Sequence, residues 1–193
     1  MFKKVLMSGI AAVGVLALSF PQLSSAEVKM HNVKQGDSIY KIAQNYGISA
    51  DQLAAMNDKK GDEIHPGEQL KLPVMLNEGE KDLLARLVEA EAKGESYAGK
   101  VAVATVVLNR IESDIFPDTL YNVIYDGYQF SPVLNGTIEQ PAGEESKRAV
   151  EEALDYQGYD RESIFFYNPD KAQSDYLSKK EVTTVIGNHV FMR

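Results

Sequence analysis

The sequence contains no cysteine among its 193 residues. Without cysteine the protein forms no disulfide bonds and no thiolate metal sites, and it has no cysteine nucleophile. Histidine is also scarce, because His31, His65 and His189 are the only three and lie far apart in the chain. Three isolated histidines disfavour a histidine-rich zinc site, although carboxylates could complete one. We therefore expect no cofactor and no metal ion in the functional site.

Positive charge is also in short supply. The chain has 20 lysines and arginines against 28 acidic residues, a formal net charge of −8 and a pI near 4.9. A negatively charged chain has no electrostatic attraction for nucleic acids or anionic membranes. We therefore expect no nucleic-acid partner and no integral membrane partner. With 44% hydrophobic and 25% charged residues, the composition is that of an ordinary globular protein with one or two small domains.

The longest apolar run lies at the N-terminus. Two lysines precede the apolar stretch from Val5 to Phe20, and the small residues Ser24, Ser25 and Ala26 follow it. This order is typical of a secretory signal peptide that is cleaved before Glu27. The run is short for a membrane-spanning helix, although an uncleaved anchor is the alternative. The sequence thus predicts that residues 1–26 are a signal peptide and that the protein is secreted.

Residues 27–73 show the pattern of a strand, two short helices and a second strand. Val33 is expected to begin the first strand, and Asp37 or Ser38 to cap the first helix. Ser49 is expected to cap the second helix, and Pro66-Gly67 to turn the chain into the last strand. The residues expected to face inward are Ile39, Ile42, Ala43, Tyr46, Leu53, Met56, Leu70 and Leu72.

The same segment resembles a LysM module. The shared pattern is Val-x-x-Gly-Asp-Ser-Ile near the start and Pro-Gly-x-x-Leu-x-Leu-Pro at the end, with Ile-Ala, Leu and Asn between them. The resemblance implies a shallow groove that binds glycans containing N-acetylglucosamine. Carried over by position, the groove would be formed by Gly36, Asp37, Ser38, Ile39, Asn57, Ile64, His65 and Pro66. Gly36, Asp37 and Pro66 are also turn-forming residues that the fold itself requires.

The stretch from Asn77 to Glu95 is predicted to be one helix. Asn77 and Glu80 have the spacing of a capping box, and Gly94 stands where a left-handed helix end is expected. At about 100° per residue, the leucines and valine of this stretch form one apolar face, and Glu91 falls within that face. Glu89 points the other way.

A carboxylate on a core-facing surface must be protonated, be paired with a cation, or open into a cleft. Glu91 also lies in the last turn, where the negative end of the helix dipole favours the neutral acid. These conditions describe a general acid, the group that a glycoside-cleaving enzyme requires. The alternative is a structural ion pair of Glu91 with Arg86 or Arg110.

After Gly94 we expect mainly helices, followed by strands. Ser96 is expected to cap a buried central helix that runs to Ile111, and an amphipathic helix is expected at 144–157. Asn109 and Arg110 are expected to tie the central helix to the strands. The segment 128–132 has strand character, as do 164–167 and the stretch 185–191, in which Gly187-Asn188 is expected to form a turn. This order predicts an α+β fold.

Several motifs of this region occur together in the order found in the spore cortex-lytic enzyme family, the SleB and CwlJ type cell wall hydrolases. The motifs are Glu91-Ala-Lys-Gly-Glu95, Gly99-x-Val-Ala-Val, Leu-Asn109-Arg110, Phe116-Pro117, Gln129-Phe130-Ser131, Phe-Tyr167-Asn168-Pro169 and Ile-Gly187-Asn188-His189-Val-Phe191. The resemblance covers nearly all of 78–193. It implies a lysozyme-like, mainly helical catalytic domain with a small antiparallel sheet, acting on peptidoglycan glycan strands. It also implies that Glu91 is the catalytic acid.

The domain organisation that follows is a signal peptide at 1–26, a βααβ LysM domain at 27–73, a linker at 74–77 and a catalytic domain at 78–193. The expected location is the cell wall, with spore cortex and vegetative wall both open as targets. Peptidoglycan, with its N-acetylglucosamine and N-acetylmuramic acid strands, is the expected partner. The candidate substrate-binding residues of the catalytic domain are Glu95, Gln129, Phe130, Ser131, Tyr167 and Asn168.

Alternatives remain open at this point. The bond between N-acetylmuramic acid and N-acetylglucosamine could be cleaved by lytic transglycosylation, which needs no second carboxylate, or by hydrolysis with Glu95 as the second acid. The resemblance favours the transglycosylase. A metal-dependent N-acetylmuramoyl-L-alanine amidase is a further alternative, against which the scarcity of histidine counts. The last is a non-catalytic wall-binding protein, against which the intact Glu91 motif counts.

Overall fold

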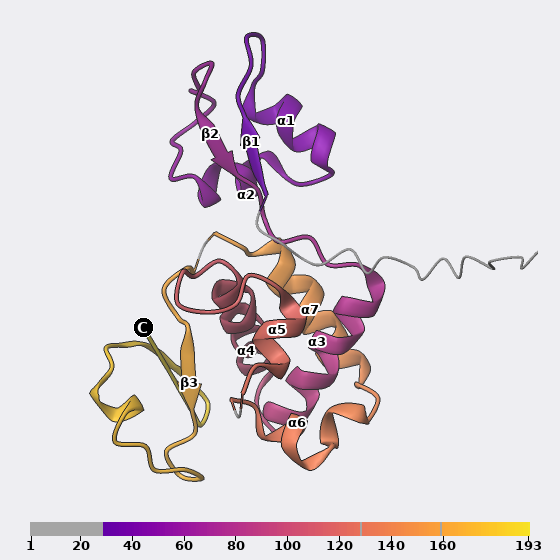
Figure 1. Cartoon of the computed structure of the whole chain (residues 1–193), viewed down its shortest axis with the longest axis vertical. Coiled ribbons are helices and arrows are strands. Elements are labelled where there is room, and N and C mark those ends of the chain that lie inside the picture. Colours follow the sequence, from indigo (N-terminus) through magenta and orange to yellow (C-terminus); the bar gives the residue numbers. More distant parts are fainter. Residues whose placement is uncertain (1–28, 128, 159) are drawn as a thin grey trace, which may run out of the picture.

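The computed structural model describes residues 29–127, 129–158 and 160–193. The predicted signal peptide lies outside these residues. Two separate hydrophobic clusters are present, one formed by residues between 33 and 72 and the other by residues between 74 and 191. We call residues 29–73 the N-terminal unit and the described part of 74–193 the C-terminal unit. Figure 1 shows the smaller N-terminal unit placed at one end of the larger, mainly helical unit.

The N-terminal unit has the predicted order of a strand, two helices and a strand. Strand β1 (Met30–Asn32) pairs antiparallel with β2 (Gln69–Lys71), and α1 (Ile39–Tyr46) and α2 (Ala50–Met56) lie between them in the chain. Ser38 and Ser49 cap the two helices, because their side-chain oxygens accept the N–H groups of Lys41 and Gln52 at 3.2 and 3.0 Å. Gly47 ends α1 in the left-handed conformation, with φ 70°.

Two details of this unit differ from the prediction. The first strand ends before Val33, whose N–H donates to the carbonyl of Glu68 while its side chain is buried. Tyr46 was expected to face inward but is 39% exposed. Its hydroxyl lies 3.1 Å from Nδ1 of His31, so this polar contact holds the ring at the surface.

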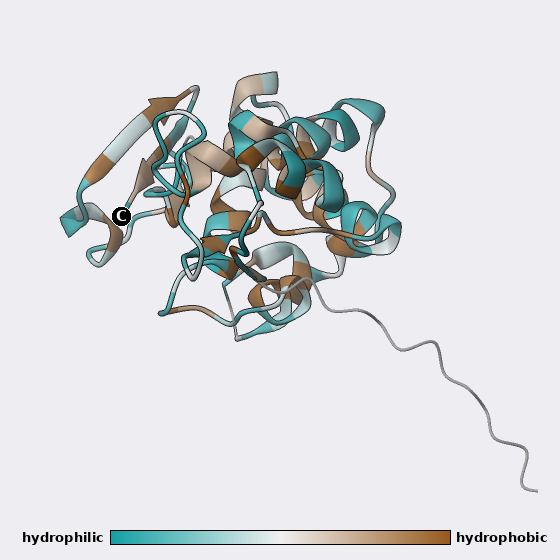
Figure 2. Cartoon of the chain, turned by 90° about the horizontal axis from the view of Figure 1, so that it is seen from above, coloured by the Kyte–Doolittle hydropathy of each residue, from teal (hydrophilic) through white to brown (hydrophobic). Residues whose placement is uncertain are grey.

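The helices of the C-terminal unit pack around α4 (Tyr97–Ile111), most of whose side chains are buried. The helix α3 (Glu78–Glu91) and the amphipathic α7 (Glu144–Asp155) both pack against it. In Figure 2, hydrophilic residues predominate on the outside of the helical part and hydrophobic residues on its inside. The shorter elements α5 (Leu120–Tyr125), α6 (Ser131–Asn135) and a 3₁₀ turn (Thr137–Glu139) complete the helical part.

Helix α3 begins as predicted and ends earlier. Asn77 and Glu80 form the reciprocal hydrogen bonds of a capping box at the N-terminus. The helix stops at Glu91 and not near Glu95, and Gly94 turns the chain with φ 86° three residues later. Glu91 is therefore the last residue of the helix.

The predicted strand at 128–132 is wrong for its described residues. Ser131 begins α6, and Gln129 and Phe130 belong to no strand. Pro132 has no N–H to donate to a sheet but is tolerated in the first turn of a helix, where that N–H has no partner. Gly136 ends the helix with φ 77°. Tyr128 lies outside the described residues.

The sheet of the C-terminal unit has the order β3-β5-β4, with antiparallel pairing throughout. Its strands are β3 (Phe165–Tyr167), β4 (Val182–Ile186) and β5 (His189–Met192), with Gly187 in the turn between the last two. Asn109 Nδ2 donates to the carbonyl of Ser163 at 3.0 Å, and Arg110 Nε to that of Ile164 at 2.8 Å. The predicted tie between the central helix and the sheet is confirmed, as is the α+β fold class.

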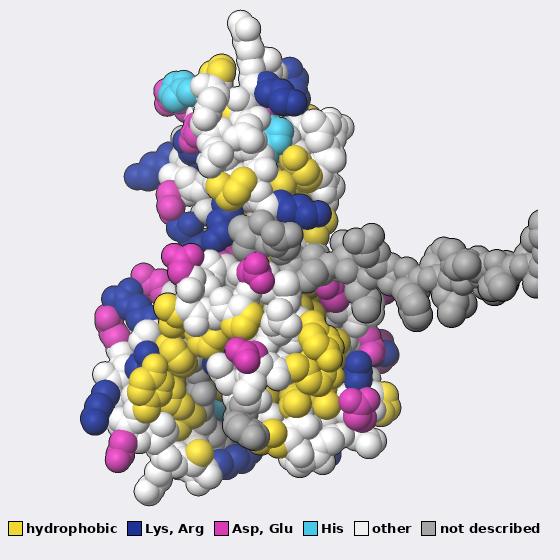
Figure 3. Space-filling model, viewed as in Figure 1, with side chains coloured by type: hydrophobic (Ala, Val, Ile, Leu, Met, Phe, Trp, Pro, Cys, Tyr) yellow, Lys and Arg dark blue, Asp and Glu magenta, His cyan; other side chains and the backbone are white. Residues whose placement is uncertain are grey.

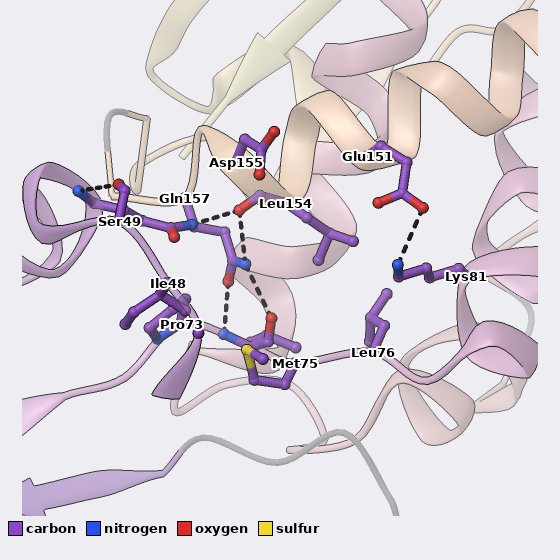
Figure 4. Close-up of a pocket in the computed structure, with 13 residues that line it drawn as sticks. Ile48, Ser49, Pro73, Met75, Leu76, Lys81, Glu151, Leu154, Asp155 and Gln157 are labelled. Carbon is purple, nitrogen blue, oxygen red and sulfur yellow. Dashed lines mark hydrogen bonds and ion pairs between the residues drawn. The ribbon is translucent and has the colours of Figure 1, made fainter. Parts of the chain in front are cut away.

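The two units meet where α2 lies against the C-terminal end of α7. Gln52 Nε2 donates to the carbonyl of Leu154. Arg161 donates to the carbonyl of Met56 at 2.8 Å and forms an ion pair with Asp58. A cavity of about 500 Å³ lies beside this contact, and Figure 4 shows that both units line it. The limits of the two domains inferred from the sequence remain a prediction.

Gln157 is the most completely bonded side chain at this junction. Its Oε1 accepts the N–H of Val74 at 2.7 Å, and its Nε2 donates to the carbonyls of Val74 and Leu154 at 3.0 and 3.1 Å (Figure 4). Since the side chain is 4% exposed, water cannot replace these bonds easily.

We expect Gln157→Ala to lower the free energy of unfolding by about 1–3 kcal/mol, because it leaves the buried N–H of Val74 without an acceptor. Thermal or denaturant unfolding measures this loss. The matched control is Gln44→Ala on the exposed face of α1, which should change stability by less than about 0.5 kcal/mol. Equal stability of both variants and the wild type would contradict the assignment.

Candidate functional site

Glu91 lies at the edge of a cavity in the C-terminal unit. Leu84, Leu87 and Val88 of the same helix are fully buried and anchor the helix in the core. The cavity has a volume of about 510 Å³, which is enough to take sugar units. It is lined by Ala90, Glu91, Arg110, Gln129, Phe130, Ser131, Leu134, Phe166, Tyr167, Asn168, Lys171, Ala172, Leu177 and His189.

The carboxyl group of Glu91 has neither a hydrogen-bond partner nor an ion-pair partner among the described residues. Burial raises its pKa from 4.5 to about 7, and the positive charges of Arg110 and Lys171 oppose that rise without cancelling it. Desolvation penalises the charged form of an acid, so near neutral pH about half of the molecules carry a protonated Glu91. The group can therefore give up a proton and take one back under the same conditions.

Five of the six predicted substrate-binding residues of this domain lie around the same cavity. They come from two segments, 129–131 at the start of α6 and 167–168 at the end of β3, and are Gln129, Phe130, Ser131, Tyr167 and Asn168. Phe130 is 2% exposed and belongs to the core as well. Asn168 stabilises a turn, since its Oδ1 accepts the N–H of Asp170 at 2.9 Å.

Glu95, the sixth candidate, does not line the cavity. Its carboxylate accepts the side-chain amide of Asn188 at 3.1 Å and the backbone N–H of the same residue at 3.2 Å. These hydrogen bonds lower its pKa. The structure therefore places Glu95 where it holds the β4–β5 turn, and Ser96 caps the next helix. In the described structure no ion pair joins Glu95 to Arg110, which the sequence offered as another possible partner of this carboxylate.

Sequence reasoning missed Lys171 at this site and considered Arg110 and His189 only as alternatives, Arg110 as a structural ion-pair partner of Glu91 and His189 as a residue that could bond to the substrate or to Glu91. Arg110 is 6% exposed although it is charged, and His189 is 4% exposed. Nη1 of Arg110 and Nδ1 of His189 are buried nitrogens without a hydrogen-bond partner in the described structure. The available signal was an arginine within a helix predicted to be buried on most sides, because such a charge requires a special environment.

Three of the candidate glycan-binding residues of the N-terminal unit form hydrogen bonds that stabilise the fold, and one other lines a hollow. Asp37 accepts the N–H of Lys34 at 2.8 Å and lies 3.1 Å from Nε2 of His31, Ser38 caps α1, and Asn57 bonds to backbone groups of Leu53 and Lys71. A shallow hollow of about 310 Å³ includes Ile39 but is otherwise lined by Ala50, Asp51, Ala54, Ala55, Lys59, Gly61 and Asp62. Gly36, Ile64, His65 and Pro66 lie outside it.

Elsewhere in the described residues, charged side chains form ion pairs and small clusters, such as Lys81 with Glu78 and Glu151 and Arg193 with Glu162 and Glu181. On the face in Figure 3, acidic and basic side chains are interspersed over both units. Within the described ranges, no three His, Asp or Glu side chains come together in a way that could hold a metal ion. No helix in those ranges is long and apolar enough to cross a membrane.

Comparison with known proteins agrees with both resemblances. A LysM domain model matches residues 31–73, and a cell wall hydrolase model matches residues 94–192. The spore cortex-lytic enzyme of Halalkalibacterium halodurans is 35% identical over 134 residues, covering 69% of this chain and 41% of that protein. The spore cortex-lytic enzyme of Bacillus subtilis is 37% identical over 109 residues, covering 56% and 36%.

The catalytic domain of the germination-specific lytic transglycosylase SleB from Bacillus anthracis is a structural neighbour. It matches with a TM-score of 0.57 and 32% identity, covering 63% of this chain and all of that domain. The chain spans less than half the length of the curated relatives described above. Since the cell wall hydrolase model matches more than half of its residues, the chain belongs to the cell wall hydrolase family and carries a LysM domain ahead of the matched region.

Proposed function

We propose that the protein is a secreted lytic transglycosylase that cleaves peptidoglycan strands between N-acetylmuramic acid and N-acetylglucosamine. The observation that carries this proposal is the unpaired carboxyl group of Glu91, which lies at the edge of a cavity with polar and aromatic walls. Its pKa is raised to about 7. The names of the relatives, spore cortex-lytic enzyme and lytic transglycosylase, support it. The LysM domain is proposed to attach the enzyme to the wall.

In the proposed reaction, protonated Glu91 first donates its proton to the glycosidic oxygen. The bond between that oxygen and C1 of the muramoyl residue breaks as positive charge develops at C1. The Glu91 carboxylate then takes the proton from the muramoyl C6 hydroxyl, while the oxygen of that hydroxyl forms a bond to C1. The products are a free N-acetylglucosamine end and a 1,6-anhydromuramic acid end, and Glu91 is protonated again.

The surroundings of Glu91 favour this outcome over hydrolysis. Hydrolysing glycosidases use a second carboxylate, placed roughly 5–10 Å from the acid across the scissile bond. Among the described residues that line the cavity, Glu91 is the one carboxylate. Glu95, the acid expected from the sequence to fill the second role, is held by Asn188. An internal C6 hydroxyl as the nucleophile makes the second carboxylate unnecessary.

Gln129, Ser131 and Tyr167 are proposed to hold the strand over Glu91. Amide and hydroxyl groups bind the hydroxyls and N-acetyl groups of sugars, and aromatic faces pack against sugar rings. Gln129 and Ser131 are exposed, and Tyr167 is half-buried. These side chains are therefore open to a ligand, whereas Phe130 and Asn168 shape the wall behind them.

Mass spectrometry of digested peptidoglycan tests the proposal. We expect 1,6-anhydromuramic ends, which are lighter by one water than the ends left by hydrolysis. Fragments with only reducing muramic acid ends would overturn the transglycosylase assignment. Peptides released from intact strands, with activity that a chelator abolishes, would indicate the amidase instead. Binding to the wall without any released product would indicate a wall-binding protein.

The pH dependence of cleavage provides a separate prediction. Because Glu91 must be protonated for the first step, kcat/KM on soluble glycan strands should fall as pH rises through about 7. The fall should approach about tenfold per pH unit once most molecules have lost the proton. A pH–rate profile between pH 5 and 9 measures it. A rate that keeps rising above pH 8 would rule out Glu91 as the acid.

A further inference from the structure

Arg110 and Glu91 approach the same cavity from different elements. Glu91 is the last residue of α3, and Arg110 lies near the end of α4. Both line the cavity, but they form no direct ion pair in the described structure. Each nevertheless acts on the other, because the charge of Arg110 lowers the pKa of Glu91 and the charge of Glu91 raises that of Arg110.

The guanidinium of Arg110 is held rigidly. Its Nε donates to the carbonyl of Ile164 at 2.8 Å. Its central carbon lies 4.7, 5.1 and 5.9 Å from the ring centres of Phe116, Phe130 and Phe165, which we call the aromatic cage. Aromatic faces attract a cation and exclude water from it, so the charge is kept in place at low solvent exposure.

This fixed guanidinium retains an unused donor. Nη1 is buried and has no hydrogen-bond partner. An unsatisfied buried donor costs about 1–3 kcal/mol and persists mainly where function requires it. If Arg110 served only to join α4 to the sheet, its bond to Ile164 would be sufficient. Arg110 and Glu91 line the same cavity, and each has a polar group without a partner among the described residues, which indicates that the two side chains act together during the reaction.

We propose that Arg110 is a positioning residue for the reaction described above, on which this inference rests: its caged guanidinium stabilises the Glu91 carboxylate that exists after the proton has been donated. Burial alone would make that carboxylate costly, so proton donation would be slow. A fixed positive charge at the same cavity lowers this cost without making Glu91 permanently ionised. Arg110 therefore allows one carboxyl to serve as acid and then as base.

Other charged groups around Glu91 do not offer the same effect. Lys171 lies in the loop after β3 and is exposed, so solvent screens its charge. His189 on β5 is buried, and burial lowers its pKa, which keeps the ring neutral near pH 7. Glu95 acts electrostatically on His189, is held by Asn188, and adds negative charge. Arg110 is thus the caged, buried cation of this group.

The first test reads the ionisation of Glu91 directly, by NMR of the full chain labelled with ¹³C at the glutamate carboxyls. Glu91→Gln identifies the Glu91 signal by its loss. We expect Arg110→Gln to raise the Glu91 midpoint by about one pH unit or more, because the positive charge that opposes the effect of burial is removed. Arg110→Lys, which keeps the charge, should move it by less than half as much. Lys171→Gln, the exposed control, should move it little.

The second test needs no substitution of Arg110, which could impair folding. In the wild-type chain, the side-chain ¹⁵N signals of Arg110 should shift with the same midpoint as Glu91, about 7. The shift should vanish in Glu91→Gln. Arg110 signals that stay constant between pH 5 and 9, or a Glu91 midpoint unchanged in folded Arg110→Gln, would overturn the proposal.

Turnover separates this inference from the proposed function. On soluble, peptide-free glycan strands, Arg110→Gln should lower kcat at least about tenfold with little change in KM, and its alkaline limb should move to higher pH. Arg110→Lys should recover part of kcat. If Arg110 had a purely structural role, its substitution would lower activity without moving the alkaline limb of the pH–rate profile. If the wild type released no glycan product, the proposed function would fail, while the two titrations would still report the coupling.

Discussion

Glu91→Gln is expected to reduce turnover on glycan strands by about 10²–10⁴-fold, the usual contribution of general acid–base catalysis. Glutamine has nearly the shape of glutamic acid but cannot donate a proton to the glycosidic oxygen or recover one afterwards. Binding of the strand should change little, because the walls of the cavity are unaltered. Release of 1,6-anhydro products from purified strands measures the loss, and sedimentation with insoluble wall measures the binding.

The same substitution should stabilise the protein, and the gain should depend on pH. The pKa of Glu91 is about 7 in the folded state, against a reference of 4.5. The folded state therefore holds a proton that the unfolded state has lost between these values, and folding becomes less favourable as pH rises through them. Glutamine avoids that cost. The difference in unfolding free energy should be small near pH 4.5 and reach about 2–3 kcal/mol at pH 8.

Glu89→Gln is the matched control, two residues away on the same helix. Glu89 accepts bonds from Ser146 Oγ at 2.6 Å and from the N–H of Gly143 at 3.3 Å, which lower its pKa. Its contribution to stability is therefore present above the unfolded pKa and disappears as pH falls through the lower folded value. We expect this variant to lose stability at neutral pH and to keep its turnover. Full activity of Glu91→Gln, or equal effects of both variants, would contradict the proposed acid.

Gly158→Ala is expected to destabilise the contact between the two units by about 2–5 kcal/mol, for two reasons that add. Gly158 has φ 94°, a conformation that costs a side-chain-bearing residue roughly 1–3 kcal/mol. A Cβ atom there would lie 2.8 Å from both the backbone nitrogen and Cγ of Met56. Because one of these atoms belongs to the backbone of α2, the clash cannot be relieved by rotating a side chain.

Gly61→Ala separates the two causes. Gly61 has φ 84°, but nothing lies within 4 Å of the position of its Cβ. This control should lose only the backbone term, about 1–2 kcal/mol. Denaturant unfolding measures both variants, and protease cleavage within 74–77 measures whether the units separate. Equal losses in the two variants would show that Met56 and Gly158 are not in contact in solution.

Local patterns in the sequence were sufficient to predict most helices and strands. The capping box of Asn77 and Glu80, the caps at Ser38, Ser49 and Ser96, and the left-handed Gly47 are all formed. Each depends on residues within one turn of one another, so the sequence contains the whole cause. The fold class followed from the order of these elements.

The errors arose where local preference and tertiary packing disagree. The aromatic and serine residues of 129–131 favour a strand, but Pro132 and Gly136 limit the segment to a short helix beside Glu91. Tyr46 has the spacing of a core residue, but its hydroxyl finds His31 at the surface. Glu95 follows Glu91 in one motif, yet the left-handed Gly94 between them sends it toward Asn188. The last two outcomes depend on partners elsewhere in the chain, His31 and Asn188.

The sequence by itself determined where most of the helices begin, which residues form most of the core, and that one glutamate stands at the end of an apolar helix face. Only the tertiary structure decided what surrounds that glutamate. It brings 129–131, 167–168 and Arg110 to one cavity, because α4, α6 and the sheet converge there from separate parts of the chain. The pKa of Glu91 depends on the burial and the charges that these elements supply together. It therefore could not be predicted from the local sequence pattern.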